Sequence, residues 1–137
     1  MAQRQLELAN YRIEQAKESL DEANFLFQGN KSLRSVVNRL YYAHFYAISA
    51  LLIFEKYSSS KHSGVLAYYN KNFIKTKAFD AELGKATNRL FEMRNRGDYR
   101  EFVQFDHDEI ADLIEKTNKL IPCVEEYLYT QKLKDKI

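Results

Sequence analysis

The sequence predicts an all-α protein, an up-and-down bundle of four long helices with one additional short helix. Apolar residues recur at spacings of three and four over most of the chain, which is the period of amphipathic helices. Glycine and proline are scarce, with four and one in 137 residues, and this disfavours a many-turned all-β fold. A chain of this length can bury a core of its own, so we expect residues 1–137 to form a single domain without a disulfide or structural metal.

The first two expected helices are long and largely apolar. The first carries an alanine-rich stripe that lets a neighbouring helix approach closely, and Gly29 begins its stop signal. Ser32 can cap the second helix, which runs from about Leu33 to Lys56. This second helix is apolar on most sides, which indicates a central helix or one that also meets a second subunit. We therefore predict a homodimer that buries part of it and the end of the fourth helix.

Two helices of different length follow a polar loop. The shorter one is expected from about Ser63 to Phe73. Asp80 can cap the fourth helix, which ends near Gly97. Residues 100–105 are expected to be irregular or extended, so they separate the fourth helix from the fifth.

The last expected helix begins with a capping box. Asp106 is its N-cap, and Glu109 stands three residues later. Pro122 lies inside the apolar pattern, where it cannot donate a backbone hydrogen bond. We expect a kink at this proline or a break just before it.

Composition limits the function classes. The net charge of +2 does not by itself indicate nucleic-acid binding, and no feature points to DNA. Cys123 is the only cysteine, and there is no P-loop, glycine-rich dinucleotide loop or His-x-x-x-His pair, so we predict no cofactor and no metal ligands. No signal peptide and no stretch apolar enough to cross a bilayer is visible, so we expect a cytoplasmic protein without a membrane partner.

The first candidate motif is Arg94-Asn95-Arg96-Gly97-Asp98-Tyr99 at the end of the fourth helix. Arg94 and Asp98 are four residues apart, as are Asn95 and Tyr99, so each pair shares a helix side. One interpretation is a weak surface ion pair with a capping asparagine. The functional interpretation is a guanidinium oriented by Asp98 toward a phosphate, with Asn95 and Tyr99 hydrogen-bonding beside it and Arg96 adding positive charge.

The second candidate group comprises Tyr42, His44 and His62. His44 lies on an apolar helix face, where a histidine is commonly a core residue satisfied by a neighbouring hydroxyl or carbonyl. His62 begins the short helix, where either capping or anion binding can explain it. As functional residues, all three are candidates for binding a nucleotide or phosphate.

In order along the chain, these motifs resemble the HEPN family, whose name stands for higher eukaryotes and prokaryotes nucleotide-binding. The resemblance rests on Asn38-Arg39-x-Tyr41-Tyr42-Ala43-x-Phe45, then Lys61-His62-Ser63-Gly64-Val65, then Arg94-Asn95-x-x-Asp98-Tyr99. It covers nearly the whole chain and is strongest with the small stand-alone prokaryotic branch. It implies a helical bundle that usually dimerises and often pairs with a minimal nucleotidyltransferase as a toxin–antitoxin couple.

The resemblance also implies a comparison with active HEPN ribonucleases. In those proteins an arginine, followed by four to six residues and a histidine, cleaves RNA without metal at the dimer cleft. Arg94 matches the arginine, but Tyr99 stands where a histidine would be, and the next histidine is His107. A tyrosine with an ordinary pKa of about 10 is a poor general base at neutral pH, so we expect little nuclease activity.

Three hypotheses remain open. The first is a module that binds a nucleotide or RNA and partners a nucleotidyltransferase, with Tyr99 as a position for nucleotidylation. The second is a metal-independent endoribonuclease toxin in which His44 or His62 of either subunit replaces the missing histidine. The third is a structural dimer without a ligand. The position of each histidine relative to Arg94 discriminates between the first two hypotheses.

Overall fold

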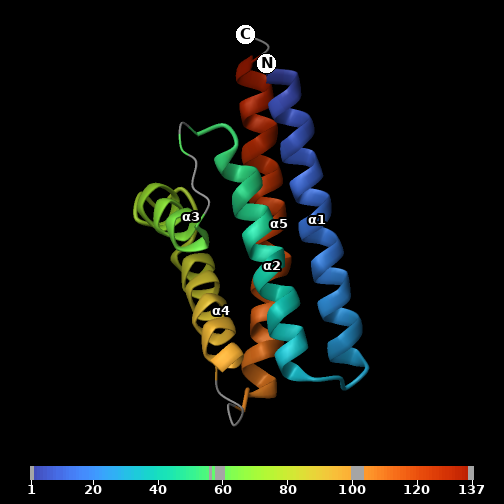
Figure 1. The fold of residues 1–137 in the computed structure, drawn as a ribbon. Coiled ribbons are helices and arrows are strands. Elements are labelled where there is room, and N and C mark those ends of the chain that lie inside the picture. The colour runs from blue at the N-terminus through green and yellow to red at the C-terminus, as the bar shows by residue number, and fades with distance from the viewer. Residues whose placement is uncertain (1, 56, 58–60, 100–103, 136–137) are drawn as a thin grey trace.

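The computed structural model describes residues 2–55, 57, 61–99 and 104–135, with backbone alone at residues 2, 96–99 and 132–135. Four long α-helices and one short one form the bundle, as predicted, and no strand occurs in these residues (Figure 1). The helical elements are α1 (Ala2–Gln28), α2 (Leu33–Leu52), α3 (His62–Tyr69), the π-helical η1 (Asn70–Ile74), α4 (Ala81–Tyr99) and α5 (His107–Asp135).

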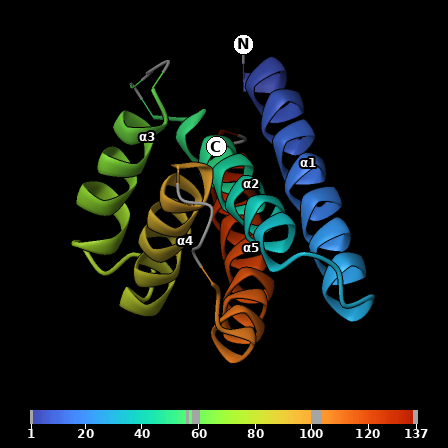
Figure 2. The same cartoon turned by 60° about the horizontal axis from the view of Figure 1, so that its bottom comes forward.

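Helix α2 lies at the centre of the bundle. It packs against α1, α3, α4 and α5, and the two views show α1 and α3 on opposite sides of it (Figures 1 and 2). Its apolar character on most sides is thus largely explained within one protomer. Helix α4 fills the space beside α2 and α5, which brings the end of α4 next to the tyrosines of α2.

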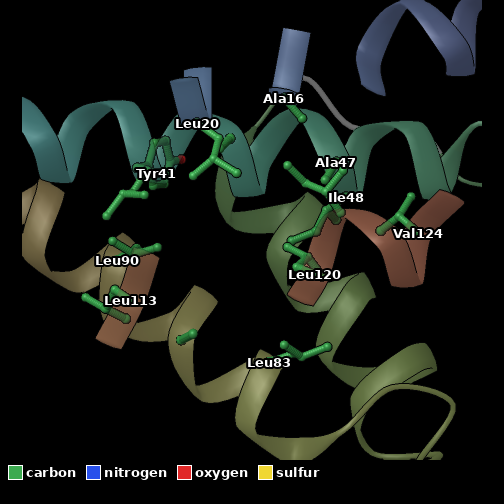
Figure 3. Packing of buried hydrophobic residues seen from close by; sticks show 14 of the residues in the cluster. Ala16, Leu20, Tyr41, Ala47, Ile48, Leu83, Leu90, Leu113, Leu120 and Val124 are labelled. Carbon is green, nitrogen blue, oxygen red and sulfur yellow. The ribbon is translucent and has the colours of Figure 1, made fainter. Parts of the chain in front are cut away.

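The core joins side chains from all the long helices (Figure 3). Ala9, Ala16 and Ala23 of α1 are fully buried, as the alanine-rich stripe predicted. Small side chains allow α1 and α2 to approach closely, which increases dispersion contacts along both helices. The large side chains Leu90 and Leu120 are completely buried where α4 and α5 meet α2.

The chain between α2 and α4 departs from the predicted boundaries. Helix α2 ends at Leu52 rather than near Lys56, and the carboxylate of Glu55 accepts hydrogen bonds from the hydroxyls of Tyr68 (2.9 Å) and Tyr127 (3.4 Å). These long-range bonds fix the chain in a turn after α2. The expected short helix is also continued by the π-helical turn of η1, where Lys75 N–H donates to the carbonyl of Asn70.

The predicted capping box at the start of α5 is only half formed. The side chain of Asp106 accepts a hydrogen bond from Asp108 N–H at 3.2 Å. Glu109 does not reach back to the cap, because its carboxylate binds Arg89 of α4 through two hydrogen bonds of 2.7 and 3.0 Å. A bidentate charged pair is stronger than a single bond to a backbone N–H. Helix α5 also continues through Pro122, so the helix has no break just before this proline.

Candidate functional site

Arg94 of α4 lies on two tyrosines of α2. Its guanidinium carbon is 4.7 Å from the ring centre of Tyr41 and 5.4 Å from that of Tyr42. Its Nη2 donates a hydrogen bond of 3.2 Å to the Tyr42 hydroxyl. A guanidinium over aromatic faces is stabilised by the ring quadrupole and remains able to donate from its edges. Arg94 is half-buried, so it is fixed by the protein while part of it stays accessible.

His62 joins this group from the start of α3. Its Nδ1 is 2.7 Å from the Tyr41 hydroxyl, and its ring stacks on Phe45 with 4.0 Å between centroids. Among the described residues, no hydrogen bond engages Nε2 of His62. Tyr41 of α2 therefore contacts Arg94 through its ring and His62 through its hydroxyl.

The charge states of this group follow from burial. Desolvation lowers the pKa of His62, and the positive charge of Arg94 lowers it further. Desolvation raises the pKa of Tyr41, although Arg94 opposes this change. At neutral pH, His62 is consequently an uncharged imidazole and Tyr41 an uncharged phenol, which leaves Arg94 as the charged member of the group.

A second arginine contacts the same aromatic surface. The guanidinium carbon of Arg39 lies 5.3 Å from the Tyr42 ring centre, and its Nη1 is 3.8 Å from a carboxylate oxygen of Glu22. Sequence reasoning did not assign Arg39 to the site. The signal available was its position three residues before Tyr42, which places both residues on one side of α2.

The chain matches the model of a known domain family. A model of the HEPN domain matches residues 9–127. The chain belongs to the HEPN domain family. The resemblance carried by the tyrosine and arginine motifs is thereby confirmed.

Three relatives show where this HEPN protein falls within the family. It is 45% identical over 121 residues to a protein of Thermotoga maritima named UPF0332, covering 88% of this chain and 91% of that protein. It is 31% identical over 121 residues to a putative toxin of Methanocaldococcus jannaschii, covering 88% and 82% of the two chains. A second putative toxin of that archaeon is 30% identical over 118 residues, covering 80% of this chain and 87% of that protein.

His44 is buried in the core beside the Arg94 group, where it lines the same small apolar pocket as Tyr41 and His62. It is 1% exposed, with Nδ1 at 2.7 Å from Thr87 Oγ1 and Nε2 at 2.9 Å from Thr117 Oγ1. A neutral imidazole donates from one nitrogen and accepts at the other. One threonine hydroxyl therefore accepts from His44 and keeps its bond to a carbonyl of its own helix, while the other donates to His44 in place of its carbonyl, which is that of Leu83 for Thr87 and of Leu113 for Thr117. Desolvation lowers the pKa of His44 to about 3. His44 is therefore a core residue that joins α2, α4 and α5, and both its nitrogens are unavailable to a phosphate.

The remaining candidates lie toward the end of α4. Asn95 is exposed. The side chains of Arg96, Asp98 and Tyr99 are outside those that the structure describes, so their expected roles beside Arg94 stay predictions. No helix in the described part of this HEPN protein is long and apolar enough to span a bilayer.

Proposed function

We propose that this HEPN protein is the nucleotide- or RNA-binding module of a toxin–antitoxin-type system, and that Arg94 is its phosphate-binding group. The contact of Arg94 with Tyr41 and Tyr42 carries this proposal. A guanidinium has five N–H donors, and the bond to Tyr42 uses one of them. Among the side chains that the structure describes, no carboxylate pairs with Arg94, so its other donors can bind an anion.

The tyrosines make Arg94 a better phosphate ligand than a freely moving surface arginine. Their rings fix the guanidinium before a ligand arrives, which lowers the entropy lost on binding. Partial burial reduces solvent screening and strengthens the attraction between guanidinium and phosphate. Planar guanidinium groups also match the oxygen spacing of phosphate through paired hydrogen bonds.

The proposed partner is a minimal nucleotidyltransferase. The family membership and the toxin names of two relatives support a two-component assignment. Tyr99, the last residue of α4, is our candidate for nucleotidylation, and we place the partner on the face that carries Arg94 and Tyr99. Intact-mass measurement after incubation with the partner and a nucleoside triphosphate tests this. No mass increase and no complex on gel filtration would reject the partner proposal.

The proposed assembly is a homodimer. Tyr42, Phe45 and Tyr46 form a half-buried aromatic stripe on α2 that the other helices leave partly uncovered. A shallow groove continues this stripe over Leu52 and Ile53 between α1 and α3. A second copy that covers the groove at Leu52 and Ile53 would remove further apolar surface from water and would leave the Tyr42 end of the stripe open to a ligand. Light scattering should give the dimer mass at micromolar concentration, and a monomer mass there would contradict the assembly.

The geometry around His62 also supports a second candidate, a metal-independent endoribonuclease. His62 and Arg94 contact the same tyrosine, so a general base and a phosphate ligand can act on one RNA linkage. His62 would remove the proton of the 2′-hydroxyl, and the 2′-oxygen would attack phosphorus. The bond to the 5′-oxygen would break as a 2′,3′-cyclic phosphate forms, and the 5′-oxygen would take a proton from water. Only the tautomer that donates from Nδ1 to the Tyr41 oxygen leaves Nε2 free to accept that proton.

The opposite tautomer favours binding without cleavage. When Nδ1 accepts from the Tyr41 hydroxyl, Nε2 carries the proton and can donate to a phosphate oxygen. We propose this state as the prevailing one, because it leaves the Tyr41 hydroxyl with an acceptor in a buried position. The protein then binds RNA with little intrinsic cleavage.

The test combines binding and cleavage with a chelator present. Wild-type protein should bind short single-stranded RNA with an affinity that falls as salt rises, and should cleave it little. Arg94→Ala should weaken binding about tenfold or more, whereas Lys17→Ala on α1 should not. Robust cleavage lost in Arg94→Ala and His62→Ala would establish the endoribonuclease instead. Absence of both binding and cleavage would leave only a structural dimer.

A further inference from the structure

We propose that Arg39 and Arg94 form two neighbouring phosphate positions around Tyr42, so that the ligand is a single strand of RNA rather than a nucleoside monophosphate. This inference rests on the proposed function of Arg94 and specifies its substrate class. It assigns Arg39 a binding role at a second phosphate of the same strand.

The two guanidiniums share one aromatic ring. Their central carbons lie 5.3 Å (Arg39) and 5.4 Å (Arg94) from the ring centre of Tyr42. Because both carbons lie within 5.4 Å of one ring centre, they are no farther apart than about twice that distance, which neighbouring phosphates of one extended strand can span. Two like charges in this arrangement repel each other, and a ligand carrying two negative charges relieves that repulsion.

The present partner of Arg39 is weakly held. Its Nη1 is 3.8 Å from Glu22 Oε1, and the side chains are 31% and 53% exposed. An exposed ion pair at this distance contributes little to stability, so a phosphate can replace the carboxylate at small cost. Glu22 then competes with the second phosphate for Arg39. Removing the charge of Glu22 should therefore strengthen RNA binding, whereas removing the charge of Arg39 should weaken it.

The aromatic side chains add a reason to favour a strand. Tyr42 and Tyr46 have ring centroids 5.8 Å apart and are both half-buried on α2, beside the arginines. Single-stranded nucleic acids are bound where basic groups follow the backbone and aromatic rings receive the bases. A nucleoside monophosphate would engage Arg94 and leave Arg39 with Glu22.

Equilibrium binding of two probes tests the inference on the full chain. The probes are uridine 5′-monophosphate and fluorescein-labelled hexauridylate. The variants are Arg39→Gln, Glu22→Gln and Arg94→Gln. The control is Lys17→Gln, because Lys17 on α1 is also a cation paired with a partly exposed carboxylate, 3.0 Å from Glu125, away from the tyrosines of α2. Thermal melting of each variant verifies folding.

Arg39→Gln should weaken hexauridylate binding about tenfold and change uridine monophosphate binding less than about twofold. It should also lower the slope of log affinity against log salt by about 0.7 for hexauridylate. Glu22→Gln should strengthen hexauridylate binding, and Lys17→Gln should leave both affinities unchanged.

Two results would separate failure of this inference from failure of the proposed function. Equal effects of Arg39→Gln on both probes, or no effect on either, would overturn the second phosphate position while Arg94 keeps its role. Unchanged binding of both probes in Arg94→Gln, or no binding by the wild type, would overturn the proposed function and with it this inference.

Discussion

The guanidinium carbon of Arg94 lies 4.7 Å from the centre of the Tyr41 ring, which places a cation of α4 on the aromatic face of a residue of α2. The same tyrosine binds His62 of α3 through its hydroxyl. Three helices that are distant in sequence thus meet at one side chain. Tyr41 is only 5% exposed, so it orients the two groups while they remain more accessible than itself.

The ring of Tyr41 should matter more for RNA binding than its hydroxyl. Tyr41→Phe keeps the aromatic face under Arg94 and should change hexauridylate affinity less than about twofold. Tyr41→Leu removes a cation–π contact of about 0.5–2 kcal/mol and should weaken binding several-fold. Fluorescence anisotropy measures both. Equal losses in the two variants would instead assign the effect to the bond with His62.

Protonation of His62 should strengthen RNA binding at acidic pH. Burial and Arg94 lower its pKa, so His62 is neutral at pH 7 and gains a proton only below the ordinary value of about 6.5. The added positive charge then attracts the phosphodiester backbone, whose own charge does not change in this range. Hexauridylate affinity should rise as pH falls from 7 toward 5. In His62→Gln this rise should disappear, and an identical profile in the variant would contradict the assignment.

His44 should make the fold sensitive to acid. Its folded pKa of about 3 is below the unfolded value near 6.5, so between these values the unfolded chain binds the extra proton. The stability contribution is complete above about pH 6.5 and is lost as pH falls toward 3, with a slope of at most about 1.4 kcal/mol per pH unit. Urea denaturation at several pH values measures it.

Two histidine variants provide the comparison for this acid dependence. His44→Gln should lower the free energy of unfolding at neutral pH. It should also remove the contribution of this residue to the slope of that free energy against pH. His107→Gln changes a side chain that is 63% exposed and serves as the control for loss of a histidine outside the core. An unchanged slope in a folded His44→Gln protein would contradict the role assigned to burial.

Gly84 should be required for the contact between η1 and α4. A Cβ atom at this position would lie 2.8 Å from Cγ2 of Ile74, closer than side chains approach. Gly84→Ala should therefore destabilise the protein by about 1–3 kcal/mol despite the better helix propensity of alanine. In an Ile74→Ala background the steric cost is removed, and the same change should stabilise by up to about 1 kcal/mol. Chemical denaturation of the four proteins tests this reversal of sign.

The sequence was sufficient for the class of fold because helical periodicity is a local property. The apolar stripe of α1 and the breaks at Gly29 and Asp80 lie within the segments they define. Contacts between distant residues could not be predicted in this way. Glu109 fits a local capping box, yet Arg89 of another helix binds it instead.

The candidate site was predictable only in part for the same reason. Arg94 and Tyr42 stood out as polar groups beside apolar helix faces, and the structure brings them together. His44 and His62 were equivalent candidates in sequence, because their different partners come from other helices. Thr117 satisfies His44 in the core, whereas Tyr41 holds His62 beside Arg94.

Arginine side-chain NMR during RNA titration tests the central claim most directly. The Nε–H resonance of Arg94, assigned by its loss in Arg94→Lys, should shift progressively as hexauridylate is added. The resonance of Arg89, whose Nε–H donates to Glu109, should stay unchanged. The shift should saturate with the dissociation constant measured by anisotropy. RNA binding that leaves the Arg94 resonance unmoved would contradict the assignment of Arg94 as the phosphate-binding group.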